Sequence, residues 1–492
     1  MAFFENDVLP SHCTIQSLTM KSRTIFLIFI LLVLACSSVH GQLEKKDLNG
    51  SWMGKLKEAG VELRLVLNFT LTDADTLRFT LDSPDQGAEG IPGGIVRIKS
   101  DTLWAYVPMV KGYYTGTPLN DTVIKGEWSQ SGRDYPMEVV KQHKKLVRLR
   151  PQEPKAPFPY KSEDITFRNT TGNFDLAGTL TLPEGNGPFP AVVLITGSGQ
   201  QDRDETIMYH KPFLVISDYL TRNGIAVLRY DDRGVGKSKG SMNEATSLTL
   251  ADDAEAAFNY LLARPEIDKK HIGLAGHSEG GLIAPIVASR NKNVAFIVSL
   301  AGTGVLGKDL LLKQNRDLLK VSGIQDSLIE EKVKYLSKVI DIVLAETDQK
   351  KAVKEALNWY NQELEAKNLT DDERKARMTE FTQALVSVNN PWFRYFLGTD
   401  PAVFWKNVKC PVLALNGEKD LQVNYEQNLN AIKTALRKGG NKKVKVQSLP
   451  SLNHLFQHCS TGSVTEYSSI EETFSPEALG IMTEWIRKTT MK

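Results

Sequence analysis

The chain has 492 residues, 41% of them hydrophobic and 24% charged, and its formal net charge at pH 7 is +2. These proportions are typical of a globular protein, and the length exceeds that of a single core, so two or three domains are expected. The near-neutral charge excludes an electrostatic case for binding nucleic acid or an anionic membrane surface.

Residues 1–41 predict a leader segment that is removed from the mature protein. Lys21 and Arg23 form a basic region, and the apolar run 25–35 that follows is too short to span a bilayer comfortably. Residues before Met20 do not fit a signal peptide, so Met20 is the expected start of the protein.

The residues at the end of this leader are compatible with more than one exported form of the protein. The small residues at 39–41 favour cleavage before Gln42, which would give a free periplasmic or secreted protein. The residues that end at Cys36 also resemble a lipobox, which predicts a lipid anchor on that cysteine. An uncleaved anchor is the third alternative.

After cleavage at Gln42 only Cys410 and Cys459 remain. Cys410 begins a predicted strand, whereas Cys459 follows the loop of His454 at the other end of the strands. This separation argues against a disulfide, because bridged Cα atoms lie within about 7 Å. Two cysteines also make no metal set. We therefore expect no disulfide, no metal and no cofactor.

Residues 43–150 predict a small antiparallel β domain, either a barrel or a sandwich. The segments 61–67 and 101–107 alternate between apolar and polar residues, and Gly, Asp and Pro separate the short strands. The domain is either a ligand- or glycan-binding module or an accessory domain that shields its neighbour or a homodimer interface. Four prolines in 151–160 then predict a stiff linker.

From residue 161 onward the pattern predicts a mostly parallel sheet flanked by helices. Residues 165–168 and 176–182 form an expected antiparallel pair. The strands expected after them are Ala191–Ile195, Ile225–Tyr230, Ile272–Ala275, Ala295–Leu300, Pro411–Leu415 and Lys443–Gln447, with helices near Pro212–Arg222 and Leu250–Ala263 and after Ser278. Segments 161–302 and 409–492 would form this core.

A G-x-S-x-G motif lies at 276–280, between one of these strands and a helix. A serine at the apex of a strand-turn-helix is the nucleophile elbow of the α/β-hydrolase fold, with Ser278 as the nucleophile. At ordinary glycine content the motif arises by chance in about one in seven chains of this length. The assignment therefore depends on an acid and a base that follow in the right order.

Residues 303–408 interrupt the alternation with a long, charged, helical segment that predicts a cap over the core. Thr370 and Glu373 make a capping box, and Asn390-Pro391 ends one helix. Trp392 and Phe393, which follow directly, either shape a substrate pocket or simply pack the cap against the core.

The required acid and base do follow, each just past the end of a predicted strand. Asp420 follows 411–415 and His454 follows 443–447. The order serine, carboxylate, histidine is that of α/β hydrolases, and parallel sheets place their sites at the carboxyl ends of the strands. Ser278, Asp420 and His454 are therefore the predicted triad.

A few alternatives stay open for each role. Glu418 could replace Asp420 but lies closer to the strand end, and His458 could replace His454 as the base. His271 precedes its strand, at the wrong end of the sheet, and His277 is expected beside the elbow rather than in the reaction.

An acyl-transfer site also needs two preorganised N–H donors for the oxyanion. The backbone N–H of Glu279, at the start of the helix, is one candidate. The other lies in the glycine-rich loop 196–200, where we choose Ser198, with Gly199 as the alternative. A phosphate-binding loop is excluded there because no G-K-[ST] follows.

Three stretches together carry a family resemblance: 196–204 (TGSGQQDRD), 230–238 (YDDRGVGKS) and the motif at 276–280. They resemble the bacterial EstD-like carboxylesterases, α/β hydrolases near the S9 and S33 serine peptidase families. The resemblance spans about residues 150–490 and implies hydrolysis of short-chain acyl esters through an acyl-enzyme, without a cofactor. Many relatives have His-Gly where this chain has Thr196-Gly197, which leaves the oxyanion geometry less certain. Asp232 and Arg233 are expected to form a structural pair.

Other functions remain alternatives. An exported serine peptidase could hold a substrate amine with Glu279, Asp202 or Asp204, and a glycan- or lipid-binding protein could carry an inactive hydrolase domain. Export disfavours a coenzyme A thioesterase, because that substrate is cytoplasmic. Acylated glycans, lipids and xenobiotics all remain open as ester substrates.

Overall fold

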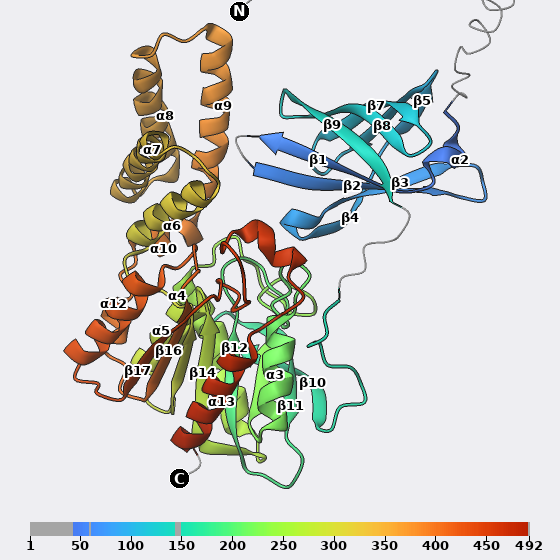
Figure 1. The fold of residues 1–492 in the computed structure, drawn as a ribbon. Coiled ribbons are helices and arrows are strands. Elements are labelled where there is room, and N and C mark those ends of the chain that lie inside the picture. The colour runs from blue at the N-terminus through green and yellow to red at the C-terminus, as the bar shows by residue number, and fades with distance from the viewer. Residues whose placement is uncertain (1–42, 59–60, 143–148, 491–492) are drawn as a thin grey trace, which may run out of the picture.

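The computed structural model describes residues 43–58, 61–142 and 149–490. They form an N-terminal β domain, a core built on a mixed sheet, and a helical cap (Figure 1). The predicted leader, with Met20 and Cys36, lies outside the described residues. Within the described part, no helix is long and apolar enough to cross a membrane.

The β domain is one antiparallel sheet of nine strands, in the order β4-β3-β2-β1-β9-β8-β7-β6-β5. The strands are β1 (Gly50–Glu58), β2 (Val61–Leu71), β3 (Leu77–Ser83), β4 (Ala88–Pro92), β5 (Val96–Lys99), β6 (Thr102–Val107), β7 (Gly112–Asn120), β8 (Val123–Gln130) and β9 (Arg133–Gln142), preceded by the short helix α2 (Lys45–Leu48). The sheet curls into half a barrel (Figure 1), which agrees with the predicted antiparallel β domain and with a barrel rather than a two-sheet sandwich. A twisted sheet this wide curls without a second sheet to cover it.

Alternation along these strands gives the β domain its own core. In β6, Leu103, Ala105 and Val107 are buried. The largest buried side chains are Trp52 and Trp128, and the Trp52 indole donates to the Leu48 carbonyl over 2.7 Å. Truncating a buried aromatic of this size typically costs about 3–5 kcal/mol, so this cluster accounts for much of the stability of the domain.

The core sheet has eight strands in the order β10-β11-β13-β12-β14-β15-β16-β17. They are β10 (Lys161–Asn169), β11 (Phe174–Leu182), β12 (Phe189–Ile195), β13 (Ala226–Tyr230), β14 (Ile267–His277), β15 (Ile297–Leu300), β16 (Val412–Gly417) and β17 (Val444–Leu449). β10 and β11 are antiparallel, and the pairs from β13 to β17 are parallel. This is the α/β-hydrolase arrangement that the sequence predicts.

Helices cover both faces of this sheet. Helices α3 (Pro212–Arg222) and α13 (Pro476–Thr490) share one apolar cluster with the sheet. The opposite face packs against α4 (Ser247–Ala263), α5 (Gly280–Arg290) and α12 (Tyr425–Lys438). Because both faces are covered, a central strand such as β13 is buried at every residue.

The cap is inserted between β15 and β16. It consists of α6 (Gly307–Val321), α7 (Asp326–Ala345), α8 (Gln349–Glu365), α9 (Asp371–Val388) and α10 (Pro391–Gly398). The capping box at the start of α9 is present, because Thr370 N–H donates to Glu373 Oε2 over 2.9 Å. The two ends of the insertion meet, since the Gly307 N–H donates to the Thr399 carbonyl over 3.2 Å.

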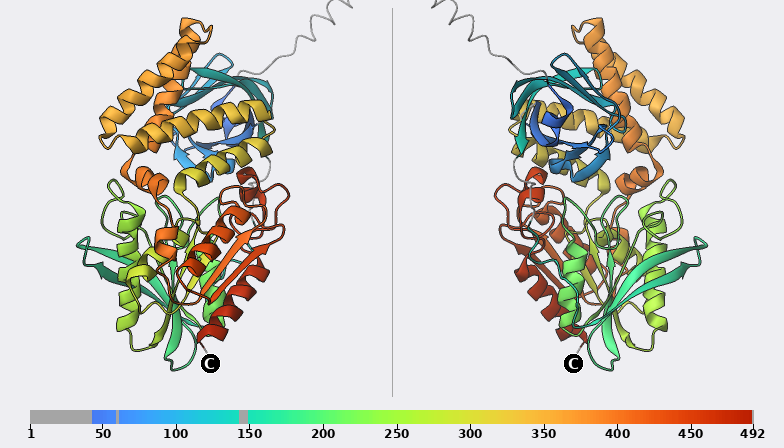
Figure 2. Two further views of the ribbon diagram at one scale, coloured as in Figure 1. Left: turned by 90° about the vertical axis from the view of Figure 1, so that its left-hand side faces the viewer. Right: turned by 90° about the vertical axis from the view of Figure 1, so that its right-hand side faces the viewer.

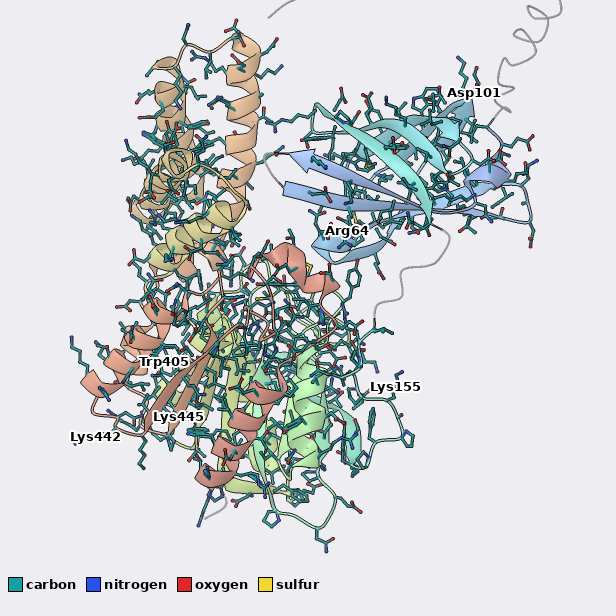
Figure 3. The ribbon with its side chains drawn as sticks, viewed as in Figure 1. Arg64, Asp101, Lys155, Trp405, Lys442 and Lys445 are labelled. Atoms are coloured by element: carbon teal, nitrogen blue, oxygen red, sulfur yellow. The ribbon has the colours of Figure 1, made fainter. Side chains whose placement is uncertain are left out.

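One helix in the range predicted for the cap packs with the core instead. Helix α11 (Ala402–Trp405) contacts α5 and α12. Its Trp405, labelled in Figure 3, is fully buried in the core cluster.

The β domain and the cap lie at the same end of the core (Figure 2). The β domain contacts the core loop that follows β12: the Tyr209 hydroxyl donates to the Ala88 carbonyl over 3.2 Å. Arg64 (Figure 3) lies 3.5 Å from the Ser468 hydroxyl, on the 3-10 helix η2 (Val464–Ser469). Both contacts involve loops at the carboxyl edge of the sheet, where the candidate site lies.

Candidate active site

Ser278 lies at the sharp turn between β14 and α5. Its φ is +53°, a left-handed conformation that is strained for a residue with a side chain. The Ser278 N–H donates to the Leu300 carbonyl of β15 over 2.9 Å, which fixes the turn. A Cβ on Gly276 would lie 2.0 Å from the Gly280 carbonyl oxygen, and one on Gly280 would lie 2.1 Å from that of Ile195. Both glycines are therefore required for this turn, and the Ser278 side chain is only half-buried.

Asp420 and His454 form a buried hydrogen-bonded pair. The distance from His454 Nδ1 to Asp420 Oδ2 is 2.7 Å. The other carboxylate oxygen accepts the N–H groups of Gln422 and Val423, each over 2.8 Å. Asp420 therefore fixes the ring so that Nδ1 carries the proton, which leaves Nε2 as the nitrogen able to accept one.

The alternatives for acid and base lie in other surroundings. Glu418 accepts a hydrogen bond from the Ser448 hydroxyl in an exposed position. His458 is exposed and pairs with Glu472 over 2.8 Å. His271 pairs with Asp268, three residues away.

His277, which directly precedes Ser278, connects the elbow to the loop that carries His454. Its Nε2 lies 2.9 Å from the His454 carbonyl oxygen, and the two imidazole rings are 4.7 Å apart. Its Nδ1 lies 2.9 Å from Oε1 of Glu205. Burial acts to lower the pKa of His277, but the charge and hydrogen bond of Glu205 outweigh it, so that pKa is raised.

Glu205 is a site residue that sequence reasoning missed. Its Oε1 also accepts the Gly197 N–H over 2.8 Å, so it holds the loop proposed for the oxyanion against the elbow. A Cβ on Gly197 would lie 3.2 Å from the Ser278 Cβ. The acidic run in 201–205 was the available signal, but it gives no spacing that identifies which carboxylate turns inward.

Asp232 fixes the glycine-rich loop 196–200 through two hydrogen bonds. Its two carboxylate oxygens accept the Thr196 hydroxyl and the Gln201 N–H, each over 2.9 Å. Burial raises the pKa of Asp232 to about 8, against the effect of these two bonds. Among the described residues, no hydrogen bond uses the N–H of Ser198 or of Glu279, so both are available as the donors that the sequence suggested.

Arg233 does not pair with Asp232, which corrects the expected structural pair. Its Nε instead donates to Asp253 on α4 over 2.7 Å, and Asp253 also accepts a hydrogen bond from Asn169. The neighbouring side chains leave the strand end in different directions, because each binds a different element.

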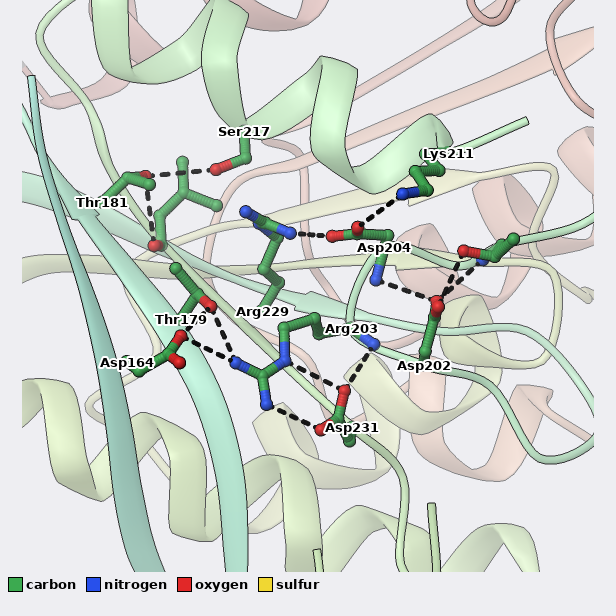
Figure 4. Close-up of polar contacts among 12 residues, drawn as sticks. Asp164, Thr179, Thr181, Asp202, Arg203, Asp204, Lys211, Ser217, Arg229 and Asp231 are labelled. Carbon is green, nitrogen blue, oxygen red and sulfur yellow. Dashed lines mark hydrogen bonds and ion pairs between the residues drawn. The ribbon is translucent and has the colours of Figure 1, made fainter. Parts of the chain in front are cut away.

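Two of the three acidic residues that a peptidase could use for a substrate amine, Asp202 and Asp204, are already engaged (Figure 4). Asp202 accepts the N–H of Asp204 and both the N–H and the hydroxyl of Thr206. Asp204 pairs with the buried Arg229, whose pKa burial lowers to about 10.

The same loop is fixed to the sheet by a second arginine (Figure 4). Arg203 binds Asp231 through Nε at 2.9 Å and Nη2 at 2.6 Å. It also donates to Thr179 on β11 over 2.8 Å. A bidentate pair of this kind is directional as well as strong, so the loop has a defined position relative to the strands.

The cap reaches the elbow through Trp392. Its indole N–H donates to Glu279 Oε1 over 2.7 Å, and the Ser247 hydroxyl donates to the same oxygen over 2.6 Å. Oε2 of Glu279 is buried and has no hydrogen-bond partner among the described residues. Burial raises the pKa of this carboxyl, against the effect of the two donors. Phe393, the second predicted pocket residue, packs on the Trp392 ring with centroids 5.1 Å apart.

The described ranges 43–58, 61–142 and 149–490 contain no group of three or more His, Cys, Asp or Glu that could hold a metal ion. Cys410 and Cys459 are both free thiols. Burial raises the pKa of Cys410 to about 12, so this thiol is not a nucleophile at neutral pH.

Known proteins that are similar to this chain include ester and thioester hydrolases. Residues 254–459 match the family "BAAT / Acyl-CoA thioester hydrolase C terminal", and residues 137–317 match "Esterase FrsA-like". The chain is 29% identical to esterase EstD of Thermotoga maritima over 299 residues, 61% of this chain and 61% of that protein. It is 27% identical to human acyl-coenzyme A thioesterase 1 over 34% of this chain and 36% of that protein. The predicted resemblance to EstD-like carboxylesterases is thus confirmed.

Solved structures with similar folds include two hydrolases. The α/β hydrolase GrgF from Penicillium sp. sh18 gives a TM-score of 0.43 at 16% identity, covering 68% of this chain and 100% of that one. The Pyrococcus furiosus esterase PF2001 gives 0.41 at 16% identity, covering 71% and 100%.

Proposed function

We propose that this chain is a serine hydrolase that cleaves short-chain carboxylic esters through an acyl-enzyme intermediate. The observation that carries the proposal is the buried pair of His454 and Asp420 at 2.7 Å, together with Ser278 on a strained turn whose preceding residue, His277, contacts the His454 backbone. Similarity to esterase EstD over 299 residues of the chain supports the reaction class.

The chemistry divides into two half-reactions. Ser278 Oγ attacks the ester carbonyl carbon while His454 Nε2 takes the hydroxyl proton, and Asp420 stabilises the imidazolium that forms. The tetrahedral oxyanion would be bound by the N–H groups of Glu279 and Ser198. Collapse releases the alcohol, which takes the proton from His454. Water then attacks the acyl-serine with His454 as the base, and Ser278 and the free acid are regenerated.

The size of the acyl group is expected to be limited by the cap. Trp392 is fixed to Glu279, next to the nucleophile, and Phe393 and Phe396 pack against the indole ring. An acyl site for a long chain needs an open apolar groove, and we expect these aromatic side chains, held next to the elbow by the bond to Glu279, to restrict it. Acetyl to butyryl esters are therefore the proposed substrates, and the alcohol part is open to glycans, lipids and xenobiotics.

Thioesters are the second candidate substrate class. The matched thioester hydrolase family covers 254–459, which includes all three proposed triad residues. The same serine chemistry cleaves a thioester, with a thiol as the leaving group. The proposed export of the protein, by cleavage before Gln42 or by lipidation of Cys36, makes an oxygen ester the first choice. A homodimer that uses the β domain remains part of the same proposal.

A peptidase and an inactive binding protein are the remaining alternatives. Asp202 and Asp204 are both engaged within the protein, which disfavours an amine-holding role for them. The pairing of His454 with Asp420 disfavours an inactive domain.

One panel of substrates separates these functions. Purified protein is assayed against p-nitrophenyl acetate and butyrate, acetyl- and butyryl-coenzyme A, and aminoacyl p-nitroanilides. The highest kcat/KM is expected on the p-nitrophenyl esters. Preference for the coenzyme A thioesters would favour the second candidate, and turnover of the anilides alone would indicate a peptidase.

A further inference from the structure

The buried imidazole of His277 faces two hydrogen-bond acceptors. Nε2 lies 2.9 Å from the His454 carbonyl oxygen, which can only accept. Nδ1 lies 2.9 Å from Oε1 of Glu205, an oxygen that already accepts the Gly197 N–H. A neutral imidazole has one N–H only and can satisfy one of these acceptors. While Glu205 is ionised, both bonds form together only if both ring nitrogens are protonated.

The charges around the ring favour this state. The groups that act on His277 are the carboxylates of Glu205 and Asp420 and the neighbouring ring of His454. Side-chain exposure is 8% for His277 and 3% for Glu205, so water cannot replace a lost donor. If the shared proton moved onto Glu205, the pair would still hold the same number of protons and would lose them in the same step.

The two bonds join three segments that are far apart in the chain. Glu205 holds Gly197, in the loop that carries the proposed oxyanion donor. His277 belongs to the elbow, and its Nε2 holds the backbone of the base, His454. Loss of the proton would leave one unprotonated ring nitrogen facing an acceptor in a buried site with no hydrogen between them, which is unfavourable.

We propose that His277 is held as an imidazolium by Glu205, and that this charge keeps the nucleophile, the oxyanion loop and the base aligned. His277 is thus a positioning residue for the reaction, which makes the inference depend on the proposed function. Two ionisations should then limit the pH range in which the enzyme is active. The acid side is set by the base, which must be neutral. The alkaline side is set by His277, which must be charged.

The Glu205→Gln variant tests this with little change in shape. The amide oxygen still accepts from His277 and from the Gly197 N–H, but the negative charge that favours the imidazolium is lost. We expect kcat/KM of the variant for p-nitrophenyl acetate to begin to fall at a lower alkaline pH than that of wild type. Above that pH, kcat/KM should decrease about tenfold per pH unit. The acid side should not move.

The exposed pair of His458 and Glu472 provides a matched control. Glu472 also accepts from a histidine ring nitrogen and from a backbone N–H. Glu472→Gln should leave the whole profile unchanged. Coincident alkaline limbs in wild type and folded Glu205→Gln would overturn the proposal.

A second measurement does not depend on activity or on the Glu205 variant. Nitrogen-15 NMR of histidine-labelled wild-type protein should show one buried ring with both nitrogens protonated at about pH 7.5, where an unperturbed histidine is neutral. His277→Gln should remove that signal. A neutral signal assigned to His277 would contradict the inference, whereas a clear imidazolium in a protein that turns over no ester would contradict only the proposed function.

Discussion

Trp392 of the cap donates its indole N–H over 2.7 Å to Glu279, the residue that directly follows Ser278. The same residue thus has two connections: its side chain holds the cap, and its backbone N–H is a proposed donor to the oxyanion. Any displacement of helix α10 acts on the elbow through this bond. Substrate choice and the geometry of the reaction are therefore coupled at one position.

Replacing Trp392 should separate these two effects. Trp392→Ala removes the ring and should widen the acyl preference toward longer chains. Trp392→Phe keeps a ring but leaves Glu279 Oε1 with Ser247 as its only donor, so stability should fall by about 1–3 kcal/mol with the acyl preference kept. The measurements are kcat/KM for acetate to decanoate esters and urea unfolding.

Trp359→Phe is the control for this series, because Trp359 lies in a separate aromatic group of the cap with Tyr335 and Phe381. It should change neither chain-length preference nor kcat. A wild-type enzyme that prefers chains longer than about ten carbons would contradict the role of the cap, since such chains need an open groove.

Ser278→Ala should lower kcat on p-nitrophenyl acetate by about 10⁵- to 10⁶-fold, because the covalent route is removed. A fluorophosphonate probe should label wild type and fail to label the variant. Ser460→Ala, in an exposed loop, should behave as wild type in both assays. Retention of esterase activity by the Ser278 variant would rule out the proposed nucleophile.

Asp420→Asn should lower kcat by about 10⁴-fold, because an amide can hold the wrong tautomer of His454. Glu418→Gln, which changes the alternative acid in the same way, should cost little, since Glu418 binds only the exposed Ser448 hydroxyl among the described contacts. Steady-state kinetics on one small ester compares the two. A larger loss of kcat in the Glu418 variant would mean that Glu418, and not Asp420, is the acid of the triad.

His210 should make the fold sensitive to acid. It is buried against Thr473 and the Tyr467 carbonyl, and burial lowers its pKa to about 4. Between about pH 6.5 and 4 the unfolded chain binds a proton that the folded chain excludes, so this contribution to stability is lost as pH falls through that window. Its size is on the order of 3 kcal/mol.

Urea unfolding at several pH values checks this expectation. His210→Gln should flatten the dependence of the unfolding free energy on pH between about 4 and 6.5, whereas the exposed His458→Gln should not. An unchanged slope in His210→Gln would assign the acid sensitivity to other groups.

Truncation should show that the proline-rich segment and the residues just before it stabilise the core in addition to linking the two domains. Arg150 donates to the carbonyls of Ser468 and Ile470 over 2.9 and 3.0 Å, and Gln152 binds the backbone of Thr473 and Phe474. A chain of residues 149–492 should keep its activity on p-nitrophenyl acetate, while one of residues 160–492 should be less stable because these contacts are gone.

The same pair of truncations tests the β domain on a second substrate. Selective loss of activity on an acetylated polysaccharide by 149–492, with the small ester unaffected, would mean that the β domain binds glycan. Equal loss on both substrates would give it a supporting role only. A well-folded 149–492 without activity on the small ester would mean that part of the active site lies in the removed domain.

Local patterns were sufficient to predict the core because its strands are continuous apolar runs. The helix expected near 212–222 is α3, and the buried runs at 411–415 and 443–447 lie in or next to β16 and β17. Asp420 and His454 could be chosen because each follows a strand end, and parallel strands bring their carboxyl ends to one edge.

Contacts between distant segments could not be predicted in the same way. Glu205 meets a histidine 72 positions away, and nothing in the local sequence identifies that partner. Arg233 binds Asp253 instead of its neighbour Asp232 for the same reason. The choice between a barrel and a sandwich stayed open because alternation within a strand indicates a buried face but does not indicate what covers it.

The cap leaves and re-enters the core at a single point, where the Gly307 N–H meets the Thr399 carbonyl at 3.2 Å. The intervening helices can therefore lengthen, shorten or be replaced without stretching β15 or β16. We therefore expect the segment to accept replacement as a unit in a chimera, provided that the bond between Trp392 and Glu279 is kept. A replacement that lacks an equivalent of Trp392 should disturb the elbow as well as the choice of substrate, because the bond to Glu279 would be lost.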